Sequence, residues 1–365
     1  MKQLLNILDT VPEFARLAAD LESGRSPVEV AGLSPVHRAH FAAGLLERLD
    51  VPVVLVCADE GECARLCADV TALAGVPAVM IGAREFLFHD GAVASRQWEH
   101  QRLAAFRAMA QGRARLIAAT VEGLLQRTLP LEELAAHVVE IRADGSYSLD
   151  ELAGRLASLG YTRCQQVEGV GQFALRGGIL DVFSPGADDP VRVEFWDRDV
   201  DSMGPFDVSS QRRVGRLDRA EFLPVSELLP VLDENGAWER LTDRQLPARY
   251  KTLATAAHHL PPEAVVCLSE SSRVAERGKN WLWQLNEDVK TLLESGGLDG
   301  RHAEFAAGMD DLMAALSDHA LCFLDSFTTS AAPLPPRDIL TAQGRQLSSF
   351  GASRDAAADD LAQLL

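Results

Sequence analysis

Two short stretches of the chain carry residue types that could do chemistry. One is the first strand-to-helix turn, residues 32–39, which reads Gly-Leu-Ser-Pro-Val-His-Arg-Ala. The other is residues 173–213, where period-two alternation places Arg192 and Trp196 on the strand face opposite Phe195. A turn of the first kind is where phosphates bind, whereas exposed arginine and tryptophan side chains are enriched at protein interfaces.

The strand-to-helix turn lacks most residues of a working phosphate loop. Such a loop needs a second glycine, then a lysine that reaches the phosphates, then a hydroxyl residue that holds magnesium. His37, Arg38 and Ala39 occupy those three positions, and only the first glycine, Gly32, is present. Pro35 removes a further backbone N–H donor. We therefore expect no ATP binding, no catalytic residues and no cofactor.

The remaining polar groups predict neither a metal site nor a catalytic centre. Asp325 ends an apolar run as a magnesium-holding aspartate would, but Ser326 follows where a second acid is expected, so a strand-end or helix-capping role is simpler. The six cysteines have no histidine or second cysteine pair at ligand spacing. His258 and His259 end an Ala/Leu-rich segment, where we expect them to interact with a helix dipole.

The second stretch reads as a compact β unit. Strands are expected at residues 173–176, 179–183 and 191–196. Gly177-Gly178 bends the chain between the first two strands, and a loop rich in Ser, Pro, Gly and Asp joins the last two. The alternation predicts one buried and one solvent-facing side.

Three side chains of this unit could form one exposed cluster. If the Val/Val/Phe side of the last strand is core, Arg192 and Trp196 face solvent, and Arg176 arrives from a neighbouring strand. The residues leave an alternative open, in which the two arginines are ordinary solvated groups that pair with Asp181 or Glu194.

This β unit resembles, in order and spacing, the second domain of the Mfd and UvrB family of repair proteins, which binds UvrA. The resemblance rests on Arg-Gly at 176–177, Ile-Leu-Asp-Val-Phe at 179–183, the strand 192–196, and Asp-Ser-Met, Phe-Asp and Gln-Arg within 201–212. It implies that three side chains contact UvrA: Arg176, Arg192 and Trp196. The chain departs from the family pattern by having a tryptophan where phenylalanine is usual.

Composition limits the other possibilities. A chain of 365 residues, 47% of them hydrophobic and 24% charged, is typical of a globular protein with two or three domains. The net charge of −18 argues against a whole-surface affinity for nucleic acid, which needs a basic footprint. No signal peptide and no apolar run of about 18 residues is visible, so we expect a cytoplasmic protein that does not contact a membrane.

The expected fold class is α/β, a degenerate RecA-like parallel sheet with an inserted β-rich domain. Strands that alternate with helices predict βαβ units on both sides of the β unit. The expected domains are a degenerate RecA-like α/β domain over 1–130, a UvrA-binding β-rich domain over 131–223, a second α/β domain over 224–330, and a linker with the start of a truncated following domain over 331–365.

The resemblance implies recruitment as the function. The chain would be the N-terminal module of a transcription-repair coupling factor that brings UvrA to stalled transcription for nucleotide excision repair, without ATPase activity of its own. RNA polymerase and duplex DNA would be partners of the full-length parent, an ATP-dependent DNA translocase, through regions absent here. Two alternatives stay open: a fragment of a UvrB-like nucleotide-dependent DNA helicase, or an intramolecular autoinhibitory clamp.

Overall fold

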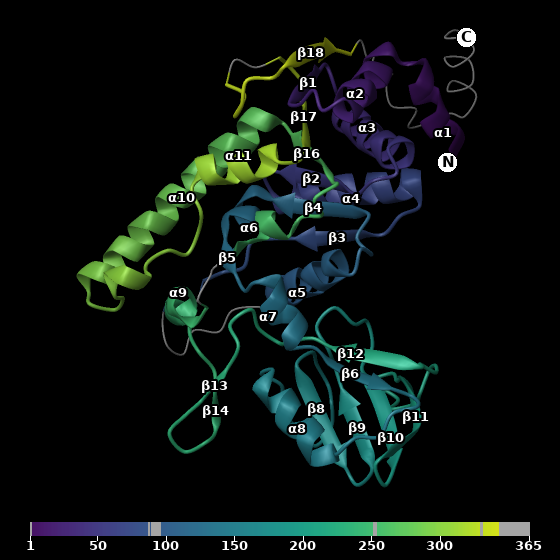
Figure 1. Ribbon diagram of the computed structural model, residues 1–365, viewed down its shortest axis with the longest axis vertical. Coiled ribbons are helices and arrows are strands. Elements are labelled where there is room, and N and C mark those ends of the chain that lie inside the picture. Colours follow the sequence, from purple (N-terminus) through teal and green to yellow (C-terminus); the bar gives the residue numbers. More distant parts are fainter. Residues whose placement is uncertain (1, 87, 89–95, 251–253, 329–330, 343–365) are drawn as a thin grey trace.

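The computed structural model describes residues 2–86, 88, 96–250, 254–328 and 331–342, and it has two parts stacked along the long axis (Figure 1). A sheet of parallel strands with helices on both faces forms one part. A smaller β-rich domain, which leaves the sheet after its fourth strand and returns before the next, forms the other. This arrangement confirms the expected fold class.

The large sheet has seven strands in the order β18-β1-β17-β16-β2-β4-β3, and the paired strands are parallel. Four of its strands are buried along their whole length, because helices cover both faces. The strand bounds are β1 (Val28–Ala31), β2 (Val53–Cys57), β3 (Ala78–Ile81), β4 (Leu116–Thr120), β16 (Val265–Ser269), β17 (Ala320–Leu324) and β18 (Asp338–Thr341).

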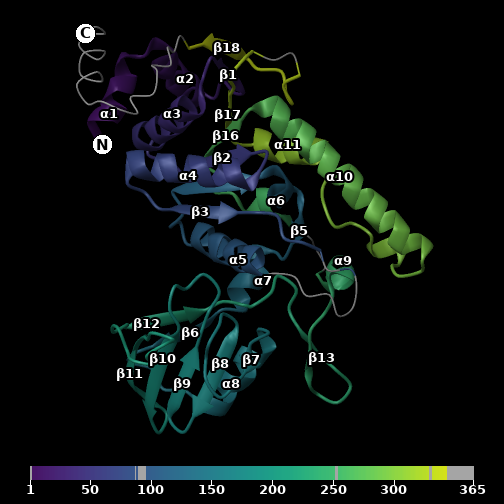
Figure 2. The same cartoon turned by 180° about the vertical axis from the view of Figure 1, so that it is seen from behind.

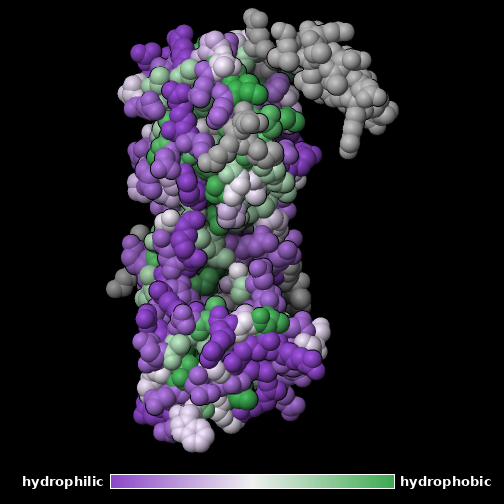
Figure 3. All heavy atoms as spheres, turned by 90° about the vertical axis from the view of Figure 1, so that its right-hand side faces the viewer, coloured by the Kyte–Doolittle hydropathy of each residue, from purple (hydrophilic) through white to green (hydrophobic). Residues whose placement is uncertain are grey.

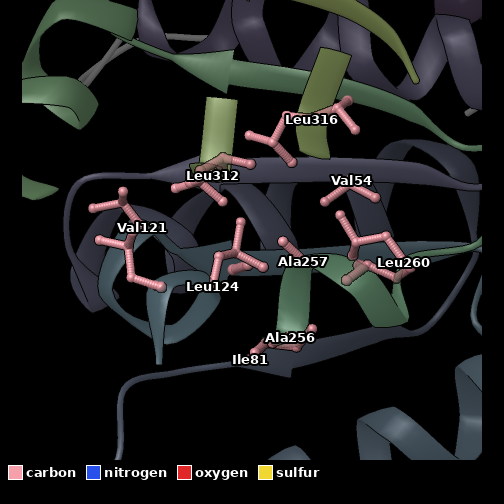
Figure 4. Packing of buried hydrophobic residues seen from close by; sticks show 14 of the residues in the cluster. Val54, Ile81, Val121, Leu124, Ala256, Ala257, Leu260, Leu312 and Leu316 are labelled. Atoms are coloured by element: carbon pink, nitrogen blue, oxygen red, sulfur yellow. The ribbon is translucent and has the colours of Figure 1, made fainter. Parts of the chain in front are cut away.

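Helices form a layer on each face of this sheet. The layers are α1 (Lys2–Asn6), α2 (Pro12–Glu22), α3 (Pro35–Arg48) and α4 (Glu60–Ala74) on one face, and α5 (Gln97–Ala110), α6 (Val121–Leu125) and α11 (Met309–Ser317) on the other, with α10 (Ser271–Glu294) extending beyond the sheet. Val54 of β2 packs with Leu124 and Leu316 on the second face (Figure 4), whereas Leu55 belongs to the core of the first.

The β-rich domain contains a five-stranded sheet in the order β11-β10-β9-β8-β7. Its strands are β7 (Thr162–Arg163), β8 (Gln172–Arg176), β9 (Ile179–Val182), β10 (Val191–Trp196) and β11 (Asp199–Pro205). Helix α8 (Leu149–Ser158) and the antiparallel pair β6 (Val139–Arg142) and β12 (Arg219–Phe222) contribute to the core on one face. The bend after β8 requires glycines, because Gly177 has φ 58° and a Cβ on Gly178 would lie 2.7 Å from the Phe195 carbonyl oxygen.

The strand order does not agree with the expectation that residues 224–330 form a second α/β domain. Strands β16 and β17 lie between β1 and β2, so this segment contributes two strands to the first sheet. An apolar run predicts a buried strand but does not say which sheet the strand joins. The expected linker also contains a strand, since β18 pairs with β1. Residues 343–365, which include the expected start of a following domain, lie outside the described residues.

Short elements connect these parts. A hairpin of β13 (Val231–Leu232) and β14 (Trp238–Glu239) projects beside the β-rich domain in both views (Figures 1 and 2). The others are η1 (Ile7–Thr10), β5 (Arg127–Thr128), α7 (Leu131–Ala136), η2 (Asp243–Gln245), α9 (Leu246–Arg249), β15 (Ala254–Thr255), η3 (Ala256–His259) and η4 (Gly300–His302). No helix in the described part of the chain is both long and apolar enough to cross a membrane.

A buried charge network fixes the point where the chain returns from the β-rich domain. The Glu227 carboxylate is fully buried and accepts hydrogen bonds from Arg102 Nε at 2.6 Å and Thr128 Oγ1 at 2.5 Å. Its backbone N–H donates to Glu99 Oε1 at 2.8 Å. Burial opposes ionisation, yet Arg102 and Arg84 hold the pKa of Glu227 below its ordinary value. Breaking such a buried pair usually costs about 3–5 kcal/mol, so this junction is firmly held.

Candidate functional site

The glycine of the strand-to-helix turn is used for packing within the chain. Gly32 follows β1 with φ 86°, a conformation that favours glycine, and its N–H donates to the Ser326 carbonyl at 3.3 Å. A Cβ at this position would clash with the carbonyl oxygen of Ala342. The backbone that follows β18 thus covers the glycine at the end of β1.

Arg38, at the position of the phosphate-loop lysine, points into the protein. Its side chain is 6% exposed, and Nη1 lies 3.0 Å from Glu62 Oε1 and 3.3 Å from Glu270 Oε1. Nη1 also donates to Ser269 Oγ at 2.6 Å. Two carboxylates therefore surround the one cation of the turn, and their negative charge would repel a phosphate. His37, the preceding residue, is half-buried, whereas Ala39 is buried in the core.

Asp325 caps a helix, as the simpler interpretation of the sequence held. Its Oδ1 accepts from the Ser271 backbone N–H at 2.6 Å and its Oδ2 from Ser271 Oγ at 2.8 Å, at the start of α10. Burial, with smaller contributions from Glu270 and Glu29, raises the pKa of Asp325 to about 6. Among the described residues no group of three or more His, Cys, Asp or Glu side chains is arranged to hold a metal ion.

The expectation that both adjacent histidines interact with a helix dipole is wrong for His259. This side chain is buried, its Nε2 lies 3.0 Å from the Leu129 carbonyl oxygen, and its ring packs edge-on against Phe106. Burial lowers the pKa of His259 to about 4, so the ring is neutral near pH 7. A neutral imidazole makes a core hydrogen bond and supplies no cation to a dipole.

The β-rich domain has the two faces that the alternation predicts. Val193 is fully buried and Phe195 is 9% exposed, whereas Trp196 is 81% exposed. We call the side that carries Trp196 the open face, defined by Arg176, Asp181, Arg192, Glu194 and Trp196. Register links these residues across strands, because Arg192 pairs with Asp181, and Arg176 and Glu194 both pair with Ile179. The open face is therefore one continuous surface over β8, β9 and β10.

Asp181 lies at the centre of the open face and joins the two arginines. It is fully buried, and it accepts from Arg176 Nη2 at 2.6 Å and from Arg192 Nε and Nη2 at 2.7 and 2.9 Å. The pairing with Asp181 that the sequence left open is thus present for both guanidinium groups. The hydrogen bond to Asp181, with its charge, raises the pKa of Arg192 above its ordinary value.

Arg192 is less accessible than expected for a solvent-facing strand residue. Its side chain is 14% exposed, compared with 44% for Arg176. Its guanidinium carbon lies 4.4 Å from the centre of the Phe206 ring, and its Nη1 and Nη2 donate to the backbone and side-chain oxygens of Gln211 at 3.0 and 3.2 Å. Gln211 has φ 58°, an uncommon conformation for a residue with a side chain. Phe206 and Gln211 belong to the motifs that carry the resemblance, but the sequence did not place them in the site.

A second polar group borders the open face beside Glu194. Arg213 Nη2 lies 3.0 Å from Glu194 Oε1, and Ser202 Oγ donates to Glu194 Oε2 at 2.8 Å. The β-rich domain, at the bottom of the view, is mostly hydrophilic on the side of the molecule that Figure 3 shows. An exposed indole is therefore an uncommon group on this domain, and it stands at the end of a strand of paired charges.

Residues 139–228 match the family model of the UvrB interaction domain. The matched segment begins at the first residue of β6 and includes Glu227. The chain is similar to the transcription-repair-coupling factors. It is 24% identical over 391 residues to the transcription-repair-coupling factor of Bacillus subtilis (strain 168), covering 96% of this chain and 33% of that protein. The resemblance seen in the sequence is confirmed.

Two other transcription-repair-coupling factors show the same relation. The protein from Myxococcus xanthus is 34% identical over 224 residues, which cover 59% of this chain and 19% of the relative. The protein from Staphylococcus aureus (strain MRSA252) is 21% identical over 347 residues, covering 84% of this chain and 30% of the relative. The chain thus spans about a third or less of the length of these relatives.

Proposed function

We propose that this chain recruits UvrA through the open face of its UvrB interaction domain. The observation that carries the proposal is Trp196, a large aromatic side chain that is 81% exposed on the face opposite the domain core. Arg176 stands on the same face with its side chain 44% exposed. Tryptophan and arginine together are typical of the few residues that supply most of the binding energy at protein interfaces.

We also propose that the parallel sheet is a scaffold without ATPase activity. Arg38 is held between Glu62 and Glu270, and the backbone at Ala342 covers Gly32. These contacts favour a module of a coupling factor over the alternative of a UvrB-like helicase fragment, because a helicase needs a phosphate loop that is open to nucleotide.

In a longer parent protein the chain would couple two activities. We infer that RNA polymerase and duplex DNA are bound by regions outside this chain, and that an ATP-dependent translocase there removes a stalled polymerase. The open face would then bring UvrA to the same site for nucleotide excision repair. The exposure of Trp196 also suits the clamp alternative, in which a distant domain of the parent covers this face until UvrA is needed.

Surface plasmon resonance with purified UvrA tests the proposal. We expect saturable binding of the chain, and loss of that binding in the double variant Arg176→Ala/Trp196→Ala. Trp283→Ala is the matched control, because Trp283 is 66% exposed on α10, outside the UvrB interaction domain. Unchanged binding by the double variant would contradict the proposal. Binding that is seen only after a distant domain has been removed from the parent would support the clamp as well.

A further inference from the structure

The three predicted contact residues of the open face, Arg176, Arg192 and Trp196, differ in how many of their groups are free for a partner. An arginine has five N–H donors, and four of those of Arg192 are directed at Asp181 and Gln211. Arg176 directs one N–H at Asp181 and has a side chain 44% exposed. Trp196 is 81% exposed. Of these three residues, the groups that a partner can reach are therefore the outer edge of Arg176 and the indole of Trp196.

Asp181 controls where the Arg176 guanidinium points. Its carboxylate is fully buried and is held by two charge-assisted hydrogen bonds from Arg192, whose own position is fixed by Phe206 and Gln211. The third hydrogen bond extends from this rigid centre to Arg176 Nη2 at 2.6 Å. A long, flexible arginine is thus fixed before it meets a partner, which lowers the side-chain entropy lost on binding.

We propose that Asp181 is the positioning residue of this surface and that Arg192 supports it, so that Arg176 and Trp196 make the direct contacts. The inference rests on the proposed function. The partner surface that fits these two groups carries a carboxylate for the free N–H groups of Arg176 beside an apolar slot for the Trp196 indole. Arg192 therefore contributes to binding through Asp181 and needs no carboxylate of its own on the partner.

Two double-mutant cycles on the whole chain, with UvrA as the probe, test this assignment. Alone, Asp181→Asn should weaken binding about tenfold, since Arg176 loses its charged tether. In the Arg176→Ala background the same change should weaken binding by less than about a further twofold, because Asp181 then has no Arg176 side chain to position. In the Trp196→Ala background the effect should again be about tenfold. A change that acted only through general loosening of the domain would weaken binding equally in both backgrounds.

Asp181→Asn leaves Arg192 buried without its full partner, so a second variant keeps the test valid if the first does not fold. Asp181→Asn/Arg192→Gln removes the buried charge pair, leaves Arg176 untethered, and should show the same dependence on background. Circular-dichroism melts of each variant establish that binding is measured on folded protein. Equal effects in the two backgrounds would overturn the assignment of Asp181. If Arg176→Ala and Trp196→Ala themselves leave UvrA binding unchanged, the proposed function fails instead.

Discussion

The strand-to-helix turn and the open face each contain a shielded arginine bound to acids, but they differ in what lies beside it. Arg38 is enclosed by Glu62 and Glu270, and backbone covers the nearby Gly32. Arg192 is bound to Asp181 in a similar way, yet its strand ends in the exposed Trp196. A paired arginine therefore marks a rigid region, and the exposed group beside it indicates whether that region can bind a partner.

The largest expected effect comes from removing the arginine of the turn. Arg38→Ala should destabilise the chain by about 3–5 kcal/mol, because it removes the nearest cation of the buried Glu62 carboxylate. Glu62 would keep only the more distant Arg273 at 3.6 Å, and the half-buried Glu270 would lose its contact with Arg38 as well. UvrA binding by the folded fraction should not change. Urea unfolding followed by circular dichroism measures the loss, and Arg65→Ala, an exposed position on α4, is the control. Weaker UvrA binding by this variant would contradict the assignment of stability to the turn and of binding to the open face.

The opposite result is expected at the open face. Trp196→Ala should cost about 1–4 kcal/mol of UvrA binding, or roughly ten- to a thousandfold in affinity. Because Trp196 is 81% exposed, the free energy of unfolding should change by no more than about 0.5 kcal/mol. Trp196→Phe restores the residue usual in the family and keeps a flat apolar anchor, so it should retain most of the affinity. Titrations by surface plasmon resonance and parallel melts separate the two quantities.

Asp325, which follows β17 and contacts the turn through the Leu33 N–H, should give the stability a pH dependence. Burial raises the pKa of Asp325 to about 6 in the folded chain, whereas an unfolded aspartate titrates near its ordinary value of about 3.9. Between these values the folded state binds more protons, so the contribution of Asp325 to stability falls as the pH rises towards 6 and is constant above about 7. Unfolding free energies of the parent and of Asp325→Asn, measured from pH 4 to 7.5, should diverge in that direction. Parallel curves would show that Asp325 titrates normally.

The smallest expected effect is on nucleotide binding. The triple variant His37→Gly/Arg38→Lys/Ala39→Ser rebuilds the residue types of a phosphate loop, but it leaves Glu62 and Glu270 in place. Isothermal calorimetry with magnesium-ATP should detect no saturable binding by the parent or by the triple variant. A binding site in the triple variant would mean that the three replacements alone closed the turn to phosphate, and that its surroundings are still suited to a nucleotide.

Local patterns in the sequence predicted the individual elements well. Strands alternating with helices were predicted on both sides of the β unit, and the buried strands β2 and β16 are apolar along their length, as parallel strands covered on both faces are. The faces of β10 followed from alternation. The assignment of the later strands to the first sheet could not be predicted in this way, because strand order depends on contacts between segments far apart in sequence.

The contacts of the candidate site were harder to predict than its residues. Arg176, Arg192 and Trp196 could be named from spacing and resemblance, but the shared hydrogen bonds to Asp181 depend on strand register. The stacking of Arg192 on Phe206 depends on the loop that follows β11, and no periodic pattern describes that loop. Contacts of this kind are set by tertiary packing, which a single sequence does not reveal.

The pairing of the entry and exit strands of the β-rich domain has a consequence for how such proteins evolve. The chain enters through β6 and leaves through β12, and the two strands pair side by side, with Val139 opposite Phe222. A segment whose ends are adjacent can be cut out, grafted or exchanged as a cassette without pulling apart the protein that carries it. The protein that carries the inserted domain can then lose an activity of its own while the inserted domain keeps its binding surface.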